Sequence, residues 1–271
     1  HAGIARSALR HSHGGGRAER PEHTARRPTI AFILDHAESK LLITDREHAP
    51  VIKDALARLG RKIPVIDIDD AETEAQGGTR GEHLGDMDYE AFLLTGDPDF
   101  AVRPPDDEWQ AISLNYTSGT TGNPKGVVYH HRGAFVTAMG GALVSRLDRR
   151  SRYLWTLPMF HCNGWSYPWS ITAAAGTHIC LRRVDPALIF PMIADHGVTH
   201  MCGAPIVLNM LIHAPDAVKR AFAQEVQVFT GGAAPPSAVI SGMEKMGFRV
   251  THLYGLTESY GPSTYCAWQD A

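Results

Sequence analysis

The sequence predicts an α/β protein built from mainly parallel sheets covered by helices. Apolar runs of strand length alternate along the chain with segments that carry apolar residues at helical spacing, and strands joined by helices form parallel sheets. Hydrophobic residues make up 44% and charged residues 20% of the 271 positions. This composition is typical of a folded globular protein and excludes overall disorder. The length provides material for one large domain or two small ones.

Residues 1–28 differ in composition from the rest of the chain. They contain six arginines and four histidines, but only Ile4 and Leu9 as large aliphatic residues. Such a segment cannot bury enough apolar surface to offset the entropy of ordering. We therefore leave it unassigned and interpret it as a disordered tail or a stretch not translated in the natural frame. A basic targeting peptide is the alternative.

The α/β pattern begins at residue 29. Apolar spacing predicts the first helices at 29–39, 49–59 and 88–94, with Gly60 ending the second. Short apolar runs predict strands at 41–44 and 63–68. Prolines and aspartates make 96–107 a predicted surface connection.

The second part of the chain continues the alternation. Its apolar runs and their punctuation predict seven strands, interrupted by four helices. The predicted strands are 111–116, 126–129, 153–157, 178–181, 200–203, 226–229 and 249–254, and the predicted helices are 132–147, 186–196, 205–213 and 236–246.

The strongest chemical signal directly follows the predicted strand 111–116. Residues 117–122 are all Ser, Thr or Gly, and Lys125 comes shortly after them. Small side chains let backbone N–H groups approach an anion, hydroxyls add donors, and lysine supplies positive charge for phosphate. Gly126 after the lysine excludes a Walker loop, and a flexible loop without a ligand is the alternative. The predicted phosphate-binding residues are Thr117, Ser118, Gly119, Thr120, Thr121, Gly122 and Lys125.

Residues 116–126, Tyr-Thr-Ser-Gly-Thr-Thr-Gly-Asn-Pro-Lys-Gly, resemble the phosphate loop of the adenylate-forming (AMP-binding) superfamily. That superfamily includes acyl-CoA synthetases, luciferases and adenylation domains. Residues 230–235 resemble its adenine-binding turn, which implies that Gly232, Ala233 and Ala234 lie beside the purine. An ordinary turn from a strand to a helix is the alternative.

Residues 254–258, Tyr-Gly-Leu-Thr-Glu, resemble the next motif of the same family. The resemblance implies that Tyr254 and Gly255 belong to the nucleotide site, that Thr257 contacts the AMP phosphate, and that Glu258 binds Mg²⁺. Magnesium prefers carboxylate oxygen and bridges phosphates. The alternative is a strand end with a satisfied carboxylate.

Residues 158–165, Pro-Met-Phe-His-Cys-Asn-Gly-Trp, resemble the segment that borders the acyl site in acyl-CoA synthetases. The resemblance implies that His161 gates the path between the acyl pocket and the thiol tunnel; a packed core histidine is the alternative. Adenylation domains for amino acids carry an Asp near this segment, and 157–169 contain none, which favours an acid without an α-amino group. The predicted acyl-site residues are His161, Gly164, Trp165 and Thr230.

The resemblance covers residues 29–271 and implies ATP-dependent activation of a carboxylic acid to an acyl-adenylate, followed by transfer to CoA. ATP, Mg²⁺ and CoA are the implied small-molecule partners. The pattern is similar to bacterial short- and medium-chain acyl-CoA ligases, including relatives of methylmercaptopropionate-CoA ligase. The alternatives are another adenylate-forming enzyme, such as an aryl-CoA ligase or a luciferase-like enzyme, or an inactive nucleotide-binding fragment.

The family's ribose-binding Asp, hinge and small C-terminal domain with its Lys are expected beyond Ala271. We therefore expect 29–271 to be part of a large AMP-binding domain. We also expect residues 1–271 alone to be poorly soluble and to make no acyl-CoA.

Charge and cysteine content narrow the function classes further. The formal net charge of −3 argues against a nucleic-acid protein held by general basicity. No apolar run reaches the ~18 residues of a membrane span. The four cysteines form no C-x-x-C pair, which favours free thiols in a reducing, cytoplasmic setting.

Overall fold

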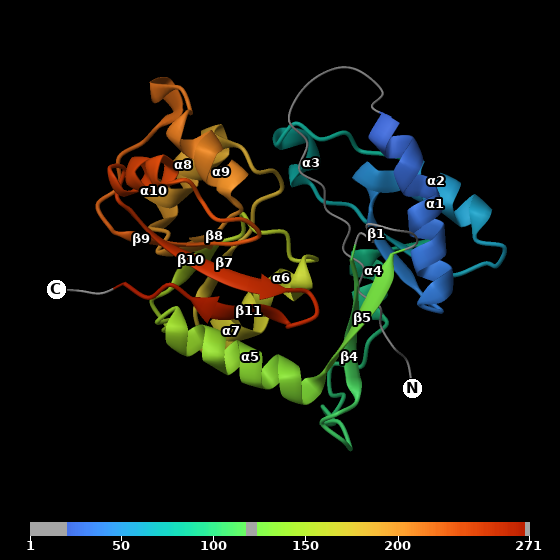
Figure 1. Ribbon diagram of the computed structural model, residues 1–271. Coiled ribbons are helices and arrows are strands. Elements are labelled where there is room, and N and C mark those ends of the chain that lie inside the picture. The colour runs from blue at the N-terminus through green and yellow to red at the C-terminus, as the bar shows by residue number, and fades with distance from the viewer. Residues whose placement is uncertain (1–20, 118–123, 269–271) are drawn as a thin grey trace. The chain divides into compact units, whose positions relative to one another are not determined.

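The structure is a computed structural model that describes residues 21–117 and 124–268, with side chains from residue 29 onward. The chain divides into two compact units, residues 1–131 and 132–271 (Figure 1).

The first unit contains a parallel sheet of three strands in the order β1-β2-β3. Its core is formed by apolar residues of α1, α2 and the first two strands, among them Leu34, Ile52 and Val65. The elements are α1 (Pro21–His36), β1 (Leu42–Asp45), η1 (Arg46–His48), α2 (Ala49–Arg58), β2 (Val65–Ile68), α3 (Glu72–Ala75), β3 (Met87–Asp88) and α4 (Tyr89–Leu94).

A separate hairpin completes the first unit. β4 (Ala111–Thr117) and β5 (Lys125–His130) pair antiparallel, with Thr117 opposite Lys125. Only residues 118–124 separate these two strands in the sequence, and a short connection of this kind joins antiparallel strands, whereas parallel strands need a longer crossover.

The second unit is built on a six-stranded sheet in the order β11-β10-β9-β8-β6-β7. Its strands pair parallel, except that β11 pairs antiparallel with β10 at one edge. The strands are β6 (Arg152–Leu154), β7 (Thr177–Ile179), β8 (His200–Cys202), β9 (Val226–Thr230), β10 (Phe248–Leu256) and β11 (Gly261–Tyr265).

Helices cover both faces of this sheet. In Figure 1, α8, α9 and α10 lie on one side, and α5, α6 and α7 lie on the other. The sheet therefore has two hydrophobic faces, as a parallel sheet requires. The helical elements are α5 (His131–Val144), α6 (Cys162–Trp165), α7 (Tyr167–Ala173), α8 (Pro186–His196), α9 (Pro205–Ile212), η2 (Asp216–Val218) and α10 (Ser237–Glu244).

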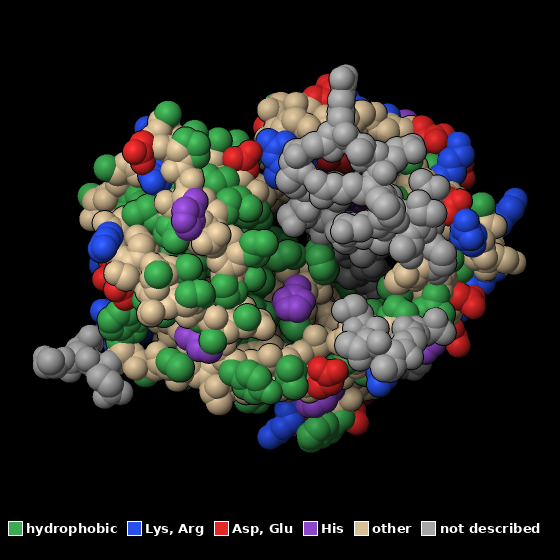
Figure 2. All heavy atoms as spheres, turned by 45° about the horizontal axis from the view of Figure 1, so that its top comes forward, with side chains coloured by type: hydrophobic (Ala, Val, Ile, Leu, Met, Phe, Trp, Pro, Cys, Tyr) green, Lys and Arg blue, Asp and Glu red, His purple; other side chains and the backbone are tan. Residues whose placement is uncertain are grey.

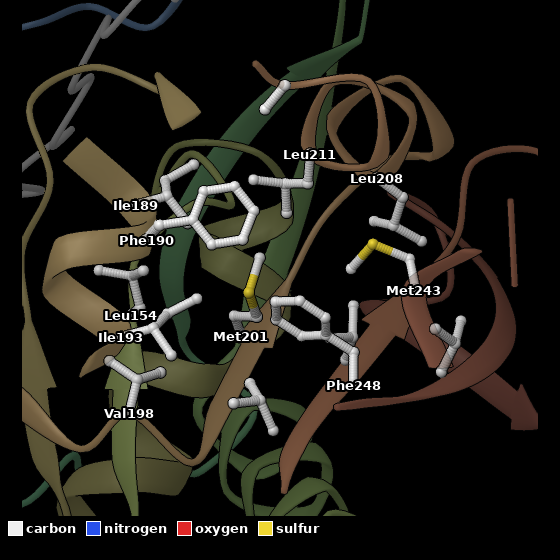
Figure 3. Packing of buried hydrophobic residues seen from close by; sticks show 14 of the residues in the cluster. Leu154, Ile189, Phe190, Ile193, Val198, Met201, Leu208, Leu211, Met243 and Phe248 are labelled. Atoms are coloured by element: carbon white, nitrogen blue, oxygen red, sulfur yellow. The ribbon is translucent and has the colours of Figure 1, made fainter. Parts of the chain in front are cut away.

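Neighbouring strand residues contribute to different cores because side chains alternate along a strand. Leu154 and Met201 pack with Phe190 and Leu208 under α8, α9 and α10, as Figure 3 shows. Tyr153 and Trp155 belong to a second core, hereafter the aromatic core, on the opposite face. Its buried members are Tyr153, Trp155, Leu157, Cys162, Trp165, Tyr167, Ile171, Cys202, Phe229 and Leu253.

Most predicted elements are present, with shifted ends. The helix predicted at 29–39 runs from Pro21 to His36 in the structure. The prediction missed its start because residues 21–28 carry no apolar periodicity. It ends before Ser39, whose N–H donates to the Leu34 carbonyl oxygen while Glu38 has a φ of 49°. This is a left-handed helix ending of the Schellman type.

Four described elements of the second unit were not predicted: α6, α7, η2 and β11. The strands β6 and β7 are also shorter than their predictions. Among the described residues no helix is long and apolar enough to span a membrane. On the face in Figure 2, Lys and Arg are interspersed with Asp and Glu.

Candidate functional site

The two residues that flank the predicted phosphate loop lie at one end of the β4–β5 hairpin in the first unit. Thr117 ends β4, Lys125 begins β5, and the two residues pair across the hairpin. Lys125 is exposed, so its ammonium group is available to an anion. The predicted residues Ser118, Gly119, Thr120, Thr121 and Gly122 lie outside the described residues.

A contact next to this end of the hairpin involves a residue that the sequence patterns did not single out. The Tyr116 hydroxyl and His36 Nδ1 are 2.7 Å apart, and the two rings meet edge to face. Partial burial raises the pKa of Tyr116. The end of α1 is thereby tied to the strand that leads into the phosphate loop.

The predicted adenine turn follows β9 in the second unit. Thr230 ends the strand and is fully buried, and its Oγ1 has no hydrogen-bond partner among the described residues. A Cβ on Gly231 would lie 2.6 Å from Leu253 Cδ1, so a side chain there would require Leu253 to shift. Gly232 has a φ of 84°, and Ala233 and Ala234 are exposed. The turn therefore presents backbone and small side chains at the carboxyl end of β9.

The predicted Thr257 and Glu258 lie in the turn that joins β10 to β11. Ser259 organises this turn, because its Oγ accepts from the Leu256 N–H at 2.9 Å and its N–H donates to the Leu256 carbonyl oxygen. Glu258 is exposed and Thr257 is half-buried. Tyr254, 59% exposed, and Gly255 precede them at a β-bulge in β10.

His161 introduces an unusual backbone segment, hereafter the left-handed turn. Residues 162–166 all have φ between 49° and 64°, and only Gly164 among them is a glycine. Left-handed backbone is unfavourable for other residues, by roughly 1–2 kcal/mol each. Gly164 also fits tightly, since a Cβ there would lie 2.8 Å from Trp155. The sequence offers only Asn163-Gly164 as a turn signal here.

The left-handed turn brings the motifs of the second unit together. Cys162 Sγ and Thr257 Oγ1 form a hydrogen bond of 3.2 Å. The Trp165 ring lies against Gly231 of the adenine turn, and the Trp165 backbone lies against Gly261. His161, Gly164, Trp165, Thr230 and Thr257 thus belong to one neighbourhood at the carboxyl ends of β6, β9 and β10. Ligands of open α/β sheets bind at such ends.

The interior beneath this neighbourhood carries no net charge at neutral pH. Burial raises the pKa of Cys202 to about 12, and burial also raises the pKa values of Tyr153 and Tyr167 well above 10. Burial lowers the pKa of His161, so its imidazole is neutral at pH 7. Within the described residues, no group of three or more His, Cys, Asp or Glu side chains is arranged to hold a metal ion.

Comparison with known proteins shows which protein family this chain is similar to. A model of the AMP-binding enzyme family matches residues 21–271. The chain is 46% identical over 250 residues to the peroxisomal acetate/butyrate–CoA ligase AAE7 of Arabidopsis thaliana, covering 89% of this chain and 44% of that protein. It is 46% identical to the 2-methylpropanoate–CoA ligase CCL4 of Humulus lupulus, covering 89% and 43%.

A third relative acts on an aromatic acid. The peroxisomal trans-cinnamate:CoA ligase of Petunia hybrida is 42% identical over 254 residues, covering 89% of this chain and 44% of that protein. The chain therefore spans less than half the length of the curated relatives it matches.

Solved structures share the fold. The N-terminal domain of FACL13 from Mycobacterium tuberculosis superposes with a TM-score of 0.66 at 27% identity, covering 88% of this chain and 56% of that one. The luciferase-like enzyme of the mealworm Zophobas morio has a TM-score of 0.67 at 18% identity, covering 85% and 52%. These matches agree with the predicted α/β fold of the large N-terminal domain of adenylate-forming enzymes.

Proposed function

Because this chain belongs to the AMP-binding enzyme family, we propose that it supplies the nucleotide and acyl sites of an acyl-CoA synthetase. One observation carries the proposal: Trp165 of the His161 segment contacts both Gly231 of the adenine turn and Gly261 at the end of the Thr257–Glu258 turn. Three motifs that are distant in sequence thereby share one neighbourhood of the second unit.

The proposed reaction has two steps. A carboxylate oxygen of the acid attacks the α-phosphorus of ATP, and pyrophosphate leaves. The CoA thiol then attacks the carbonyl carbon of the acyl-adenylate, loses its proton, and displaces AMP to form the thioester. Negative charge develops on the phosphates in the first step, so preorganised donors there lower the barrier.

The residues of the chain divide this work. Thr117 and Lys125, with the loop between them, donate to the phosphates, and Thr257 donates to the α-phosphate. Tyr254, Gly255 and the small residues Gly232 to Ala234 accommodate the adenosine. These roles rest on the family resemblance, together with the exposure of Lys125, Tyr254 and residues 232–234.

Among the described site residues, Glu258 supplies the carboxylate that would hold Mg²⁺. When bound, Mg²⁺ neutralises phosphate charge, and it commonly takes one or two carboxylates together with substrate phosphates. Glu258 supplies one exposed carboxylate at the β10–β11 turn, which suits an ion that arrives with the nucleotide.

We propose a short- or medium-chain acid without an α-amino group as the substrate. The segment around His161 contains no carboxylate to hold an ammonium group, and the aromatic core beneath it is uncharged. The acetate/butyrate and 2-methylpropanoate ligases support this class. The likeness to bacterial ligases, including relatives of methylmercaptopropionate-CoA ligase, stays a prediction.

An aryl-CoA ligase is the second candidate, favoured by the 42% identity to the trans-cinnamate:CoA ligase. The compartment also stays a prediction. Cysteines without a C-x-x-C pair favour a reducing compartment such as the cytoplasm, while AAE7 is described as peroxisomal.

Calorimetric titration of the chain with non-hydrolysable sulfamoyl analogues of acyl-adenylates tests the proposal. We expect the butanoyl analogue to bind at one site, with AMP as a competitor, and the alanyl analogue to bind much more weakly. Tighter binding of the cinnamoyl than of the butanoyl analogue would select the aryl-CoA ligase. Failure to bind any analogue, or AMP, would reject the proposed function.

A further inference from the structure

The left-handed turn holds the β10–β11 turn at three points. Cys162 bonds to Thr257, Asn163 lies beside the Tyr260 hydroxyl, and Trp165 packs against Gly261. Thr257, Tyr260 and Gly261 span the turn that also carries Glu258. The two turns therefore form one unit of local structure, although Cys162 and Thr257 are 95 residues apart in the sequence.

The thiol of Cys162 reaches Thr257 because of the backbone that carries it. Cys162 has a φ of 49°, and its side chain is buried, with 3% exposed. A non-glycine residue in this conformation is uncommon and persists only where its surroundings hold it. Cys162 occupies this conformation at the start of the left-handed turn, and its sulfur lies 3.2 Å from the threonine oxygen.

We propose that Cys162 is a positioning residue that orients the Thr257 hydroxyl toward the nucleotide phosphate. The inference rests on the proposed function, because the phosphate is Thr257's expected ligand. A hydroxyl has one donor proton and two acceptor lone pairs. A thiol that donates to Oγ1 restrains the rotamer of Thr257 and uses only an acceptor site of its hydroxyl, so that in the complex the hydroxyl proton can be donated to a phosphate oxygen.

Binding of two ligands, AMP and adenosine, distinguishes a positioning role of Cys162 from a role in packing alone. AMP carries the phosphate that Thr257 would contact, and adenosine lacks it while presenting the same base and ribose. Loss of the positioning bond should therefore weaken AMP binding selectively. The expected loss is about ten-fold in AMP affinity, the effect of a charge-assisted hydrogen bond, with adenosine affinity changed by less than about two-fold.

Variants of Cys162 and one matched control make the test specific. Cys162→Ser keeps a hydroxyl donor and should retain the wild-type ratio of AMP affinity to adenosine affinity. In Cys162→Ala this ratio should fall. Cys162→Gly also removes the thiol, and glycine adopts positive φ without strain, so it keeps the test decisive if the alanine variant unfolds. Cys202→Ala is the matched control, because it truncates another buried thiol of the aromatic core.

Titration calorimetry with AMP and with adenosine, on the wild-type chain and these variants, gives the outcome. We expect selective AMP loss in Cys162→Ala and Cys162→Gly, but not in Cys162→Ser or Cys202→Ala. If the wild type binds AMP no better than adenosine, both the phosphate site and this inference are wrong. If the wild type prefers AMP and the preference survives Cys162→Gly or Cys162→Ala, only the positioning role is rejected.

Discussion

Glu258 shows what a single side chain contributes to this site. Its carboxylate is exposed in the β10–β11 turn, and it is the only acidic residue between Tyr254 and Pro262. Mg²⁺ needs such an oxygen when it binds with a nucleotide. Glu258 is therefore the carboxylate that we propose to hold Mg²⁺ beside the phosphates.

Glu258→Gln keeps the size of the side chain and removes its charge. We expect the wild-type chain to bind ATP more tightly with Mg²⁺ than without it. In the variant, this Mg²⁺-dependent increase in ATP affinity should be about ten-fold smaller, the effect of one charge-assisted contact. Calorimetric titration with ATP at several Mg²⁺ concentrations measures it. Glu244→Gln, at an exposed position that ends α10, serves as the control. Superimposable magnesium dependence of wild type and Glu258→Gln would make Glu258 a structural residue.

His161 and Cys162 show the limit of single-residue prediction. The sequence singled out His161, because its segment resembles a known motif, and the structure adds that burial lowers its pKa. Nothing in the sequence pointed to Cys162 as the partner of Thr257. That contact depends on a left-handed backbone that one Asn-Gly pair does not specify.

The β10–β11 hairpin carries four of the predicted site residues, Tyr254, Gly255, Thr257 and Glu258. β10 bulges between Tyr254 and Gly255, and Gly255 lies directly against the Gly261 carbonyl oxygen of β11. A side chain at Gly255 would run into backbone, which cannot move aside as a flexible side chain can. The close approach of these two glycines sets the path of the turn that contains Thr257 and Glu258.

Gly255→Ala should therefore push the hairpin open. We expect a loss of about 1–3 kcal/mol of unfolding free energy, typical of overpacking, together with weaker AMP binding. Denaturant unfolding and calorimetry measure the two effects. Gly140→Ala is the matched control, because a Cβ at that helical position of α5 meets nothing within 4 Å; it should stabilise by about 0.5–1 kcal/mol. Equal stability of the two variants would show that the hairpin accommodates the methyl group.

Elements with strong periodicity were predicted, and elements defined by backbone geometry were not. The predicted helix 186–196 agrees with α8 at both ends, because Pro186 starts it and Gly197, with a φ of 58°, follows it. The short α7 was missed, since Ser and Pro interrupt its apolar pattern. β11 was missed because Gly261 and Pro262 at its start are typical of loops.

At the scale of the molecule, the family motifs predicted a set of site residues but not how those residues meet in the fold. Within the second unit, Thr230, Thr257 and His161 gather because β6, β9 and β10 run parallel and end at the same edge. A βα alternation in sequence predicts that edge. The aromatic core beneath that edge was not predicted. Its composition depends on which face of the sheet each strand residue points to, and the register of the strands decides this.

The buried titratable groups of the second unit also set a pH range for the stability of the whole chain. Burial lowers the pKa of His200 below its ordinary 6.5, although the Ser145 carbonyl and Asp148 act in the opposite direction. The unfolded chain therefore takes up a proton first, and stability is lost as the pH falls below about 6.5. Burial raises the pKa of Cys202 from 9.0 to about 12 and that of Tyr153 well above 10. These acids ionise first in the unfolded chain, so stability is also lost as the pH rises above about 9.

We therefore expect the melting temperature of the chain to be highest between about pH 6.5 and 9 and to fall on both sides. Thermal unfolding followed by circular dichroism from pH 5 to 10.5 measures it. His200→Gln keeps an N–H for the Ser145 carbonyl, which His200 Nε2 contacts at 3.0 Å, and should flatten the acid side. Tyr153→Phe should flatten the alkaline side, while His213→Gln, at an exposed position, should leave the profile unchanged. An acid side equally steep in wild type and His200→Gln would assign the loss to groups other than this histidine, because the slope reports the difference in bound protons between the two states.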